Sequence, residues 1–182
     1  MPAIKYRQSA GFAGDVTRLH PASISAEPLD TTNPPAFTGQ GVVVDATSNK
    51  VRKLISGDGT STIVLHGVTV RSFPFQQAQT GISSYDSKNY SGSVGFGGGA
   101  LPVGGVSDVL QQGFILVNVP TGQTPVKGGN VYIWNAASSG VHVNGGFEAS
   151  STGGSTVQVT NAVFTGGVDS NGNAEIKFNI PG

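Results

Sequence analysis

Turn-forming residues recur about every ten residues along this chain, and no stretch between them has a convincing helical period. Glycine accounts for 28 of the 182 residues, well above its usual share of roughly 7%. Short runs of β-branched and aromatic residues lie between the turns, which is typical of strands buried on at least one face. Evenly spaced strands of this kind predict an all-β fold, a small antiparallel β-sandwich or barrel of jelly-roll-like form.

The strongest strand signals lie in the middle of the chain. Residues 113–119 and 130–134 are rich in β-branched and aromatic side chains, and the second run ends at Trp134, the one tryptophan. The connection, residues 120–129, contains prolines and glycines that exclude a helix and favour turns. This pattern predicts a long-looped hairpin at the centre of the core.

Two further patterns carry local signals. Residues 62–73 form the longest strand candidate, and Gly67 in its middle predicts a bulge or the close approach of another backbone. Near the end of the chain, the pair Asn171-Gly172 precedes an alternating run, and this pair is a strong hairpin signal. We therefore expect a tight turn at this point.

The length suits one domain with a hydrophobic core of its own. Residues 1–20 predict an extended N-terminal arm, because glycines interrupt any helical run there, and a frayed terminus fits them equally well. Residues 21–182 are expected to form a single β domain. Around residues 76–105 a segment rich in Gly, Ser, Gln and Tyr lacks any packing pattern, so it predicts an irregular inserted loop.

Charge is scarce in this protein. Charged residues make up 11% of the chain against an average of roughly 25%, and the formal net charge is zero. No cluster of Lys and Arg could neutralise several phosphates, so we expect no nucleic-acid partner. No apolar run reaches the ~18 residues of a membrane span, and residues 1–7 lack the apolar region of a secretory signal. These features predict synthesis in a cytoplasm, no membrane partner, and surfaces suited to burial against neighbours.

Two glycine-containing motifs match binding sites only in part. Residues 95–100 fit the dinucleotide pattern Gly-x-Gly-x-x-Ala, but neither the strand before it nor the helix after it is present. Residues 169–173 begin like a calcium loop, yet Ala174 and Ile180 occupy the positions that require glycine and a bidentate carboxylate. We expect no cofactor and no metal.

The three histidines, His20, His66 and His142, are widely spaced and form no metal-binding pattern. The chain also has no cysteine and no Gly-x-Ser-x-Gly nucleophile motif. We therefore expect a structural or binding protein, and no enzyme.

The order of these motifs along the chain is informative. The motifs lie, in chain order, at residues 11–16, 37–44, 63–70, 106–119, 126–133, 146–149, 162–164 and 174–180. Their succession resembles that of the capsid cement (decoration) proteins of tailed bacteriophages over most of the length, and best from residue 106 to residue 180.

The resemblance implies a small β-barrel or β-sandwich that binds the outer surface of a phage head at junctions between major capsid proteins and stabilises the shell. It also implies a homodimer or homotrimer that needs no cofactor. We expect the contacts to come from the arm and the irregular loops, although the loop aromatics could equally cover a satellite core. The residues concerned are Lys5, Tyr6, Arg7, Arg18, Tyr85, Tyr90 and Phe96.

A host-recognition module of a tail fibre or spike is the alternative function. Such a module would bind a glycan by stacking the sugar on Tyr85, Tyr90 or Trp134. Fibres often contain repeats or a coiled-coil stem, and the sequence shows neither.

Overall fold

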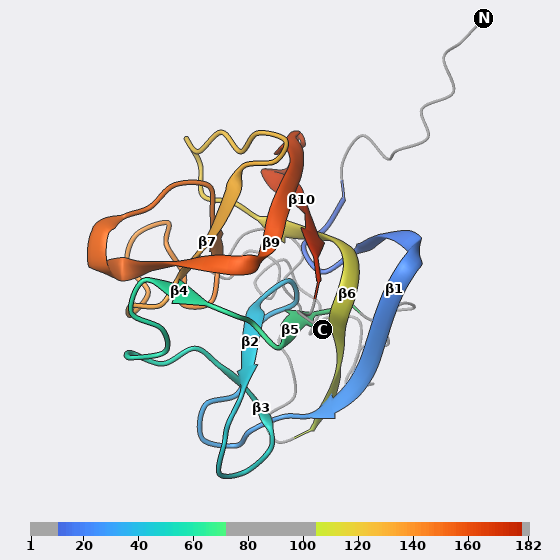
Figure 1. Cartoon of the computed structure of the whole chain (residues 1–182), viewed down its shortest axis with the longest axis vertical. Helices are drawn as coiled ribbons and strands as arrows, with labels where there is room; N and C mark the ends of the chain where they lie inside the picture. Colours follow the sequence, from blue (N-terminus) through green and yellow to red (C-terminus); the bar gives the residue numbers. More distant parts are fainter. Residues whose placement is uncertain (1–10, 72–104, 180–182) are drawn as a thin grey trace, which may run out of the picture.

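The computed structural model describes residues 11–71 and 105–179 (Figure 1). Within these ranges the protein is built from strands, with one short 3-10 helix at Gly153–Ser155. The predicted irregular loop and the Gly-x-Gly-x-x-Ala motif lie outside the described residues. The strands are β1 (Val16–Pro28), β2 (Gly41–Val44), β3 (Val51–Lys53), β4 (Thr62–Ile63), β5 (Gly67–Thr69), β6 (Val106–Asn118), β7 (Asn130–Trp134), β8 (Phe147–Glu148), β9 (Thr156–Val168) and β10 (Asn173–Phe178).

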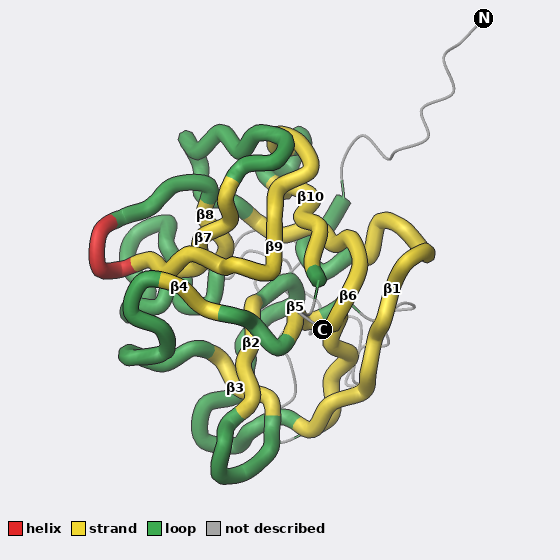
Figure 2. Tube along the Cα trace, viewed as in Figure 1, coloured by secondary structure: helices red, strands yellow, loops and turns green. Residues whose placement is uncertain are grey.

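All ten strands belong to one sheet, in the order β3-β2-β5-β6-β10-β9-β7-β8, with β1 also paired to β6 and β4 to β9. Every strand pair is antiparallel except β4–β9. The sheet curls into a half-barrel, which Figures 1 and 2 show as strands wrapping around a common centre. The predicted all-β fold is therefore confirmed.

β6 is the strand around which the sheet is arranged. One of its edges pairs with β1, and its other edge pairs first with β5 and then with β10. Its side chains alternate, so Ile115 and Val117 enter the core while Phe114 lies on the opposite face.

The core lies on the concave side of the curled sheet. Phe147, Phe164 and Phe178 are fully buried there beside aliphatic side chains from β6, β7, β9 and β10. Fully burying one such side chain contributes about 1.5–3 kcal/mol. A second, smaller cluster of Leu29, Val42, Val51 and Val109 packs where β2 and β3 meet β6.

The predicted central hairpin is wrong. β6 and β7 do not pair, because β10 and β9 lie between them: Ile115 pairs with Ile176, and Ile133 pairs with Val157. Residues 119–129 connect the two strands across three strand spacings, about 14 Å, a span that a chain of this length reaches easily. The connection has the composition of turns, but it is long enough to let β6 pair with β10 and β7 pair with β9.

The predicted long strand at residues 62–73 is divided at Gly67. β4 pairs in parallel with β9, whereas β5 pairs with β2 and β6. A Cβ atom on Gly67 would lie 2.3 Å from Val109 Cγ1 and 2.7 Å from the Leu110 carbonyl oxygen. The predicted close backbone approach at Gly67 is therefore confirmed.

The turn at Asn171-Gly172 is also confirmed, and it joins β9 to β10. Asp169 Oδ1 accepts the N–H groups of Asn171 (2.8 Å) and Asn173 (2.9 Å), and Gly172 has φ +75°. These turn contacts account for the Asp and Asn side chains in residues 169–173, which begin like a calcium loop.

Part of the predicted arm belongs to the folded sheet. β1 begins at Val16, which pairs with Ile115 and packs against the core. The described part of the predicted arm, residues 11–20, therefore includes the start of β1. Residues 1–10 lie outside the described residues.

Candidate functional site

Of the seven predicted contact residues, Arg18 is the one that lies in the described part of the chain. It lies on β1 opposite Phe114 of β6, with its guanidinium carbon 3.9 Å above the centre of the phenyl ring. The other six predicted contact residues, Lys5, Tyr6, Arg7, Tyr85, Tyr90 and Phe96, lie outside the described residues.

The guanidinium of Arg18 also forms an ion pair with Glu175 of β10. Its Nη2 lies 2.8 Å from Glu175 Oε2, and the two side chains are 50% and 2% exposed. The buried carboxylate additionally accepts the hydroxyl of Thr17 at 2.6 Å and the hydroxyl of Thr165. Because a buried carboxylate is costly without partners, these groups hold Arg18 in one place.

The sequence alone does not identify Glu175 as a partner of Arg18, which lies 157 residues away. The alternating pattern of residues 175–178 did predict the strand, and it places Glu175 and Lys177 on the face opposite Ile176. Which strand would lie next to that face could not be inferred from the pattern.

Residues 11–15 are tightly fixed before β1 begins. The N–H of Gly11 donates to Asp169 Oδ2 at 2.9 Å, and the carbonyl of Gly11 accepts the side-chain amide of Asn173 at 2.7 Å. Asp15 Oδ1 lies 2.6 Å from Arg71 Nε. The segment that follows residues 1–10 is therefore anchored both to the β9–β10 turn and to the residues after β5.

A second polar cluster lies at the loop between β7 and β8. His142 stacks on Trp134 with ring centres 4.3 Å apart, and its Nδ1 lies 2.7 Å from Glu148 Oε1. Gln123 donates to the other oxygen of this buried carboxylate. The contact between His142 and Glu148 joins the loop to β8, and no hydroxyl group of the described residues hydrogen-bonds to the imidazole of His142.

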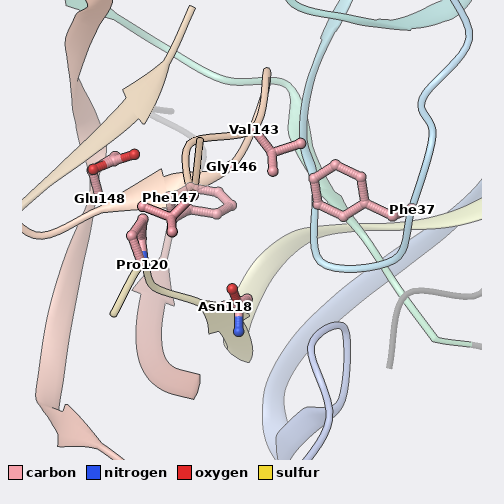
Figure 3. A pocket seen from close by; sticks show the side chains of 8 residues that line it. Phe37, Asn118, Pro120, Val143, Gly146, Phe147 and Glu148 are labelled. Carbon is pink, nitrogen blue, oxygen red and sulfur yellow. The ribbon is translucent and has the colours of Figure 1, made fainter. Parts of the chain in front are cut away.

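A small hollow adjoins this cluster, and Figure 3 shows the side chains that line it, among them Phe37, Phe147 and Glu148. Its space is about 20 Å³, enough for a single water molecule. Trp134 is 6% exposed and donates its indole N–H to the Ala137 carbonyl at 3.0 Å. The predicted stacking of a sugar on Trp134 is therefore wrong.

His66 contacts Glu27 and Gln111, with His66 Nε2 lying 3.5 Å from Glu27 Oε1. In residues 11–71 and 105–179, no three His, Cys, Asp or Glu side chains gather where they could hold a metal ion. No helix among these same residues is long and apolar enough to cross a membrane.

An arginine–carboxylate cluster fixes the turns around β3. Arg52 binds Asp58 through both terminal nitrogens, at 2.6 and 2.9 Å, and its Nε lies 3.4 Å from Asp45. The hydrogen bonds that Arg52 donates to Asp58 raise the pKa of Arg52. Burial raises the pKa of Asp58, but hydrogen bonds from Arg52 and the Ile55 amide outweigh it and leave that pKa lowered. The backbone amide of Ser48 is the main cause of the lowered pKa of Asp45.

The chain is similar to phage capsid proteins in two comparisons. The family model of the XM1 gp53 minor capsid protein matches residues 1–178. The solved structure of the capsid of Myoviridae phage XM1 contains a chain that superposes with a TM-score of 0.65 at 20% identity, covering 98% of this chain and 96% of that one. At this identity the structural likeness shows the fold. No curated protein sequence matches the chain.

A family match that spans nearly the whole chain does not depend on one local motif. Together with the shared fold, it accounts for the ordered strands and turns of the sequence. The chain therefore belongs to the XM1 gp53 minor capsid protein family, and so to the structural proteins of phage capsids.

Proposed function

We propose that this protein is a cement (decoration) protein that binds the outer surface of a phage head at junctions between major capsid proteins and stabilises the shell. The family match over residues 1–178 is the observation that carries the proposal. The role is structural, and it requires no catalytic group.

The physical properties of the described residues support such a role. A protein that binds only the assembled shell stabilises the shell by mass action, and many copies can resist opening even when each contact is modest. The small number of charged residues lowers the cost of desolvating a contact surface. The hydrogen bonds that fix Gly11 supply a firm attachment point for residues 1–10.

We further propose that the protein acts as a homodimer or homotrimer and that it is made in the host cytoplasm before it binds the head. Contacts with the major capsid protein are assigned to Lys5, Tyr6, Arg7, Arg18, Tyr85, Tyr90 and Phe96. Of these, Arg18 has the geometry of a contact residue, since its side chain is half exposed and held in place.

The proposal is tested with expanded heads that lack the protein. Purified protein should bind to them in sedimentation, and the decorated heads should retain their DNA at a higher temperature than bare heads. If purified protein does not cosediment with such heads, the proposed function is wrong. A virion map with the protein inside the shell would contradict the outer-surface position.

A further inference from the structure

A row of side chains crosses the outer face of four neighbouring strands, which lie side by side in Figures 1 and 2. Arg18 of β1 pairs with Phe114 of β6, Phe114 with Lys177 of β10, and Lys177 with Val163 of β9. Directly opposed residues on neighbouring strands point to the same side of a sheet. We call these four residues the outer row.

The outer row faces away from the core, because the residues next to it, Ile115, Ile176 and Phe164, point inward and are buried. Lys177 is exposed, Val163 is 41% exposed, and Phe114 is partly buried under the guanidinium of Arg18. The row therefore offers two cations with apolar surface beside each of them.

The two cations retain unused hydrogen-bonding capacity. Arg18 uses Nη2 for Glu175 and has no further hydrogen bond or ion pair to the described residues. Lys177 has no ion pair with any described carboxylate. An arginine held by stacking and by a buried carboxylate loses little freedom when it binds a second carboxylate with its free edge.

We propose that the outer row binds an acidic segment of a neighbouring shell protein. The free N–H groups of Arg18 and the ammonium of Lys177 each bind a carboxylate, and Phe114 and Val163 pack against the apolar part of the same segment. This inference rests on the proposed function and names the chemistry of the partner.

Charge complementarity favours a different protein over a second copy of this chain. Of its ten carboxylates, Asp86 lies outside the described residues, and each of the others already has a partner within the fold. Those partners are hydrogen-bond donors or cations that bind Asp15, Glu27, Asp30, Asp45, Asp58, Glu148, Asp169 and Glu175. Asp108 also has an interaction partner. A nucleic acid is disfavoured because two cations on a neutral protein cannot follow a phosphate backbone.

The test compares Lys177→Glu with Lys50→Glu in binding to heads that lack the protein. Both variants change the net charge equally, but Lys50 lies on the turn between β2 and β3, away from the outer row. At low salt, Lys177→Glu should bind about tenfold more weakly because it replaces an attraction by a repulsion, and Lys50→Glu should bind within about twofold of wild type. Arg18→Lys, which keeps the cation beside Glu175, should weaken binding about threefold through loss of the planar fork.

Thermal unfolding of each variant establishes that the fold is intact, and Lys177→Gln provides a neutral version with an intermediate expected effect. Failure of the wild type to bind would refute the proposed function. Normal head binding of Lys177→Glu, or equal losses of binding for Lys177→Glu and Lys50→Glu, would refute the proposed role of the outer row but not the proposed function. A change in molar mass by light scattering for Lys177→Glu, with unchanged head binding, would assign the row to contact between copies and overturn the inference.

Discussion

Gly11 and Asp169 are 158 residues apart in the sequence, and the N–H of Gly11 donates to the carboxylate of Asp169 at 2.9 Å. The same carboxylate accepts two backbone amides of the turn that joins β9 to β10. One side chain thus closes a local turn and fixes the segment before β1. The β9–β10 turn therefore takes part in positioning Gly11 and the segment before β1.

Replacing Asp169 tests this double role. Asp169→Ala should lower the free energy of unfolding by about 2–4 kcal/mol, because three backbone amides lose a charged acceptor. Urea unfolding measures the change. Ser170→Ala, at an exposed position in the same turn, should stay within about 0.5 kcal/mol of wild type. Equal losses of unfolding free energy in both variants would mean that the backbone alone holds the turn, without the side chain of Asp169.

Tight packing at Gly41 gives a second prediction. A Cβ atom there would lie 2.4 Å from Ile133 Cδ1 and 2.9 Å from Leu65 Cδ1, both buried. Gly41→Ala should therefore destabilise the protein by about 1–3 kcal/mol. Gly154→Ala provides the control, since a Cβ atom at Gly154 meets nothing within 4 Å. A melting temperature of Gly41→Ala equal to that of Gly154→Ala would contradict the close packing.

The carboxylates around Arg52 make the stability of the fold depend on pH. The pKa values of Asp30, Asp45 and Asp58 are lowered from 3.8 in the folded protein, for Asp30 mainly through the Asn33 amide. The stability that they contribute is complete above their ordinary pKa and is lost as the pH falls through the lowered values. We expect the free energy of unfolding to fall as the pH drops below about 4.

The variant Arg52→Met isolates the part of this effect that comes from the arginine. It removes one partner of Asp58 and one partner of Asp45, so urea unfolding should show a smaller fall over the same pH range. The amides that bind Asp30 remain, so part of the dependence should persist. If the free energy of unfolding depended on pH in this variant as it does in wild type, Arg52 would not be lowering these pKa values.

The predicted contacts of residues 1–10 are tested by replacing Lys5, Tyr6 and Arg7 together with alanine. Binding to heads that lack the protein should weaken at least about tenfold, since aromatic and arginine side chains dominate protein interfaces. The melting temperature of the isolated protein should stay unchanged. Normal head binding by this triple variant would move the contacts to other surfaces.

Local signals predicted the parts of the fold that are determined locally. The Asn171-Gly172 pair gave the correct turn because positive φ and side-chain hydrogen bonding act within a few residues. The all-β fold followed from spacing and composition. The pairing of β6 did not follow from these signals, because which strands lie side by side depends on contacts between residues that are distant in the sequence. Ile115, for example, pairs with Ile176 of β10 and not with a residue closer in the chain.

The candidate site was predicted even less completely, for the same reason. Arg18 was predicted to be a contact residue, but its fixed orientation depends on Phe114 and Glu175, which come from two other strands. Glu175 and Lys177 alternate with buried residues on β10, and only the folded structure shows that Glu175 is covered by Arg18 while Lys177 is exposed.

The three hydrogen bonds that hold Gly11 also have a mechanical consequence. Asp169, Asn171 and Asn173 all bind the backbone of this single residue. A tensile force that enters the fold at Gly11 would load these bonds in parallel, so they must rupture together instead of peeling apart one by one. If residues 1–10 tether this protein to a swelling shell, the strain reaches a reinforced point before it reaches β1.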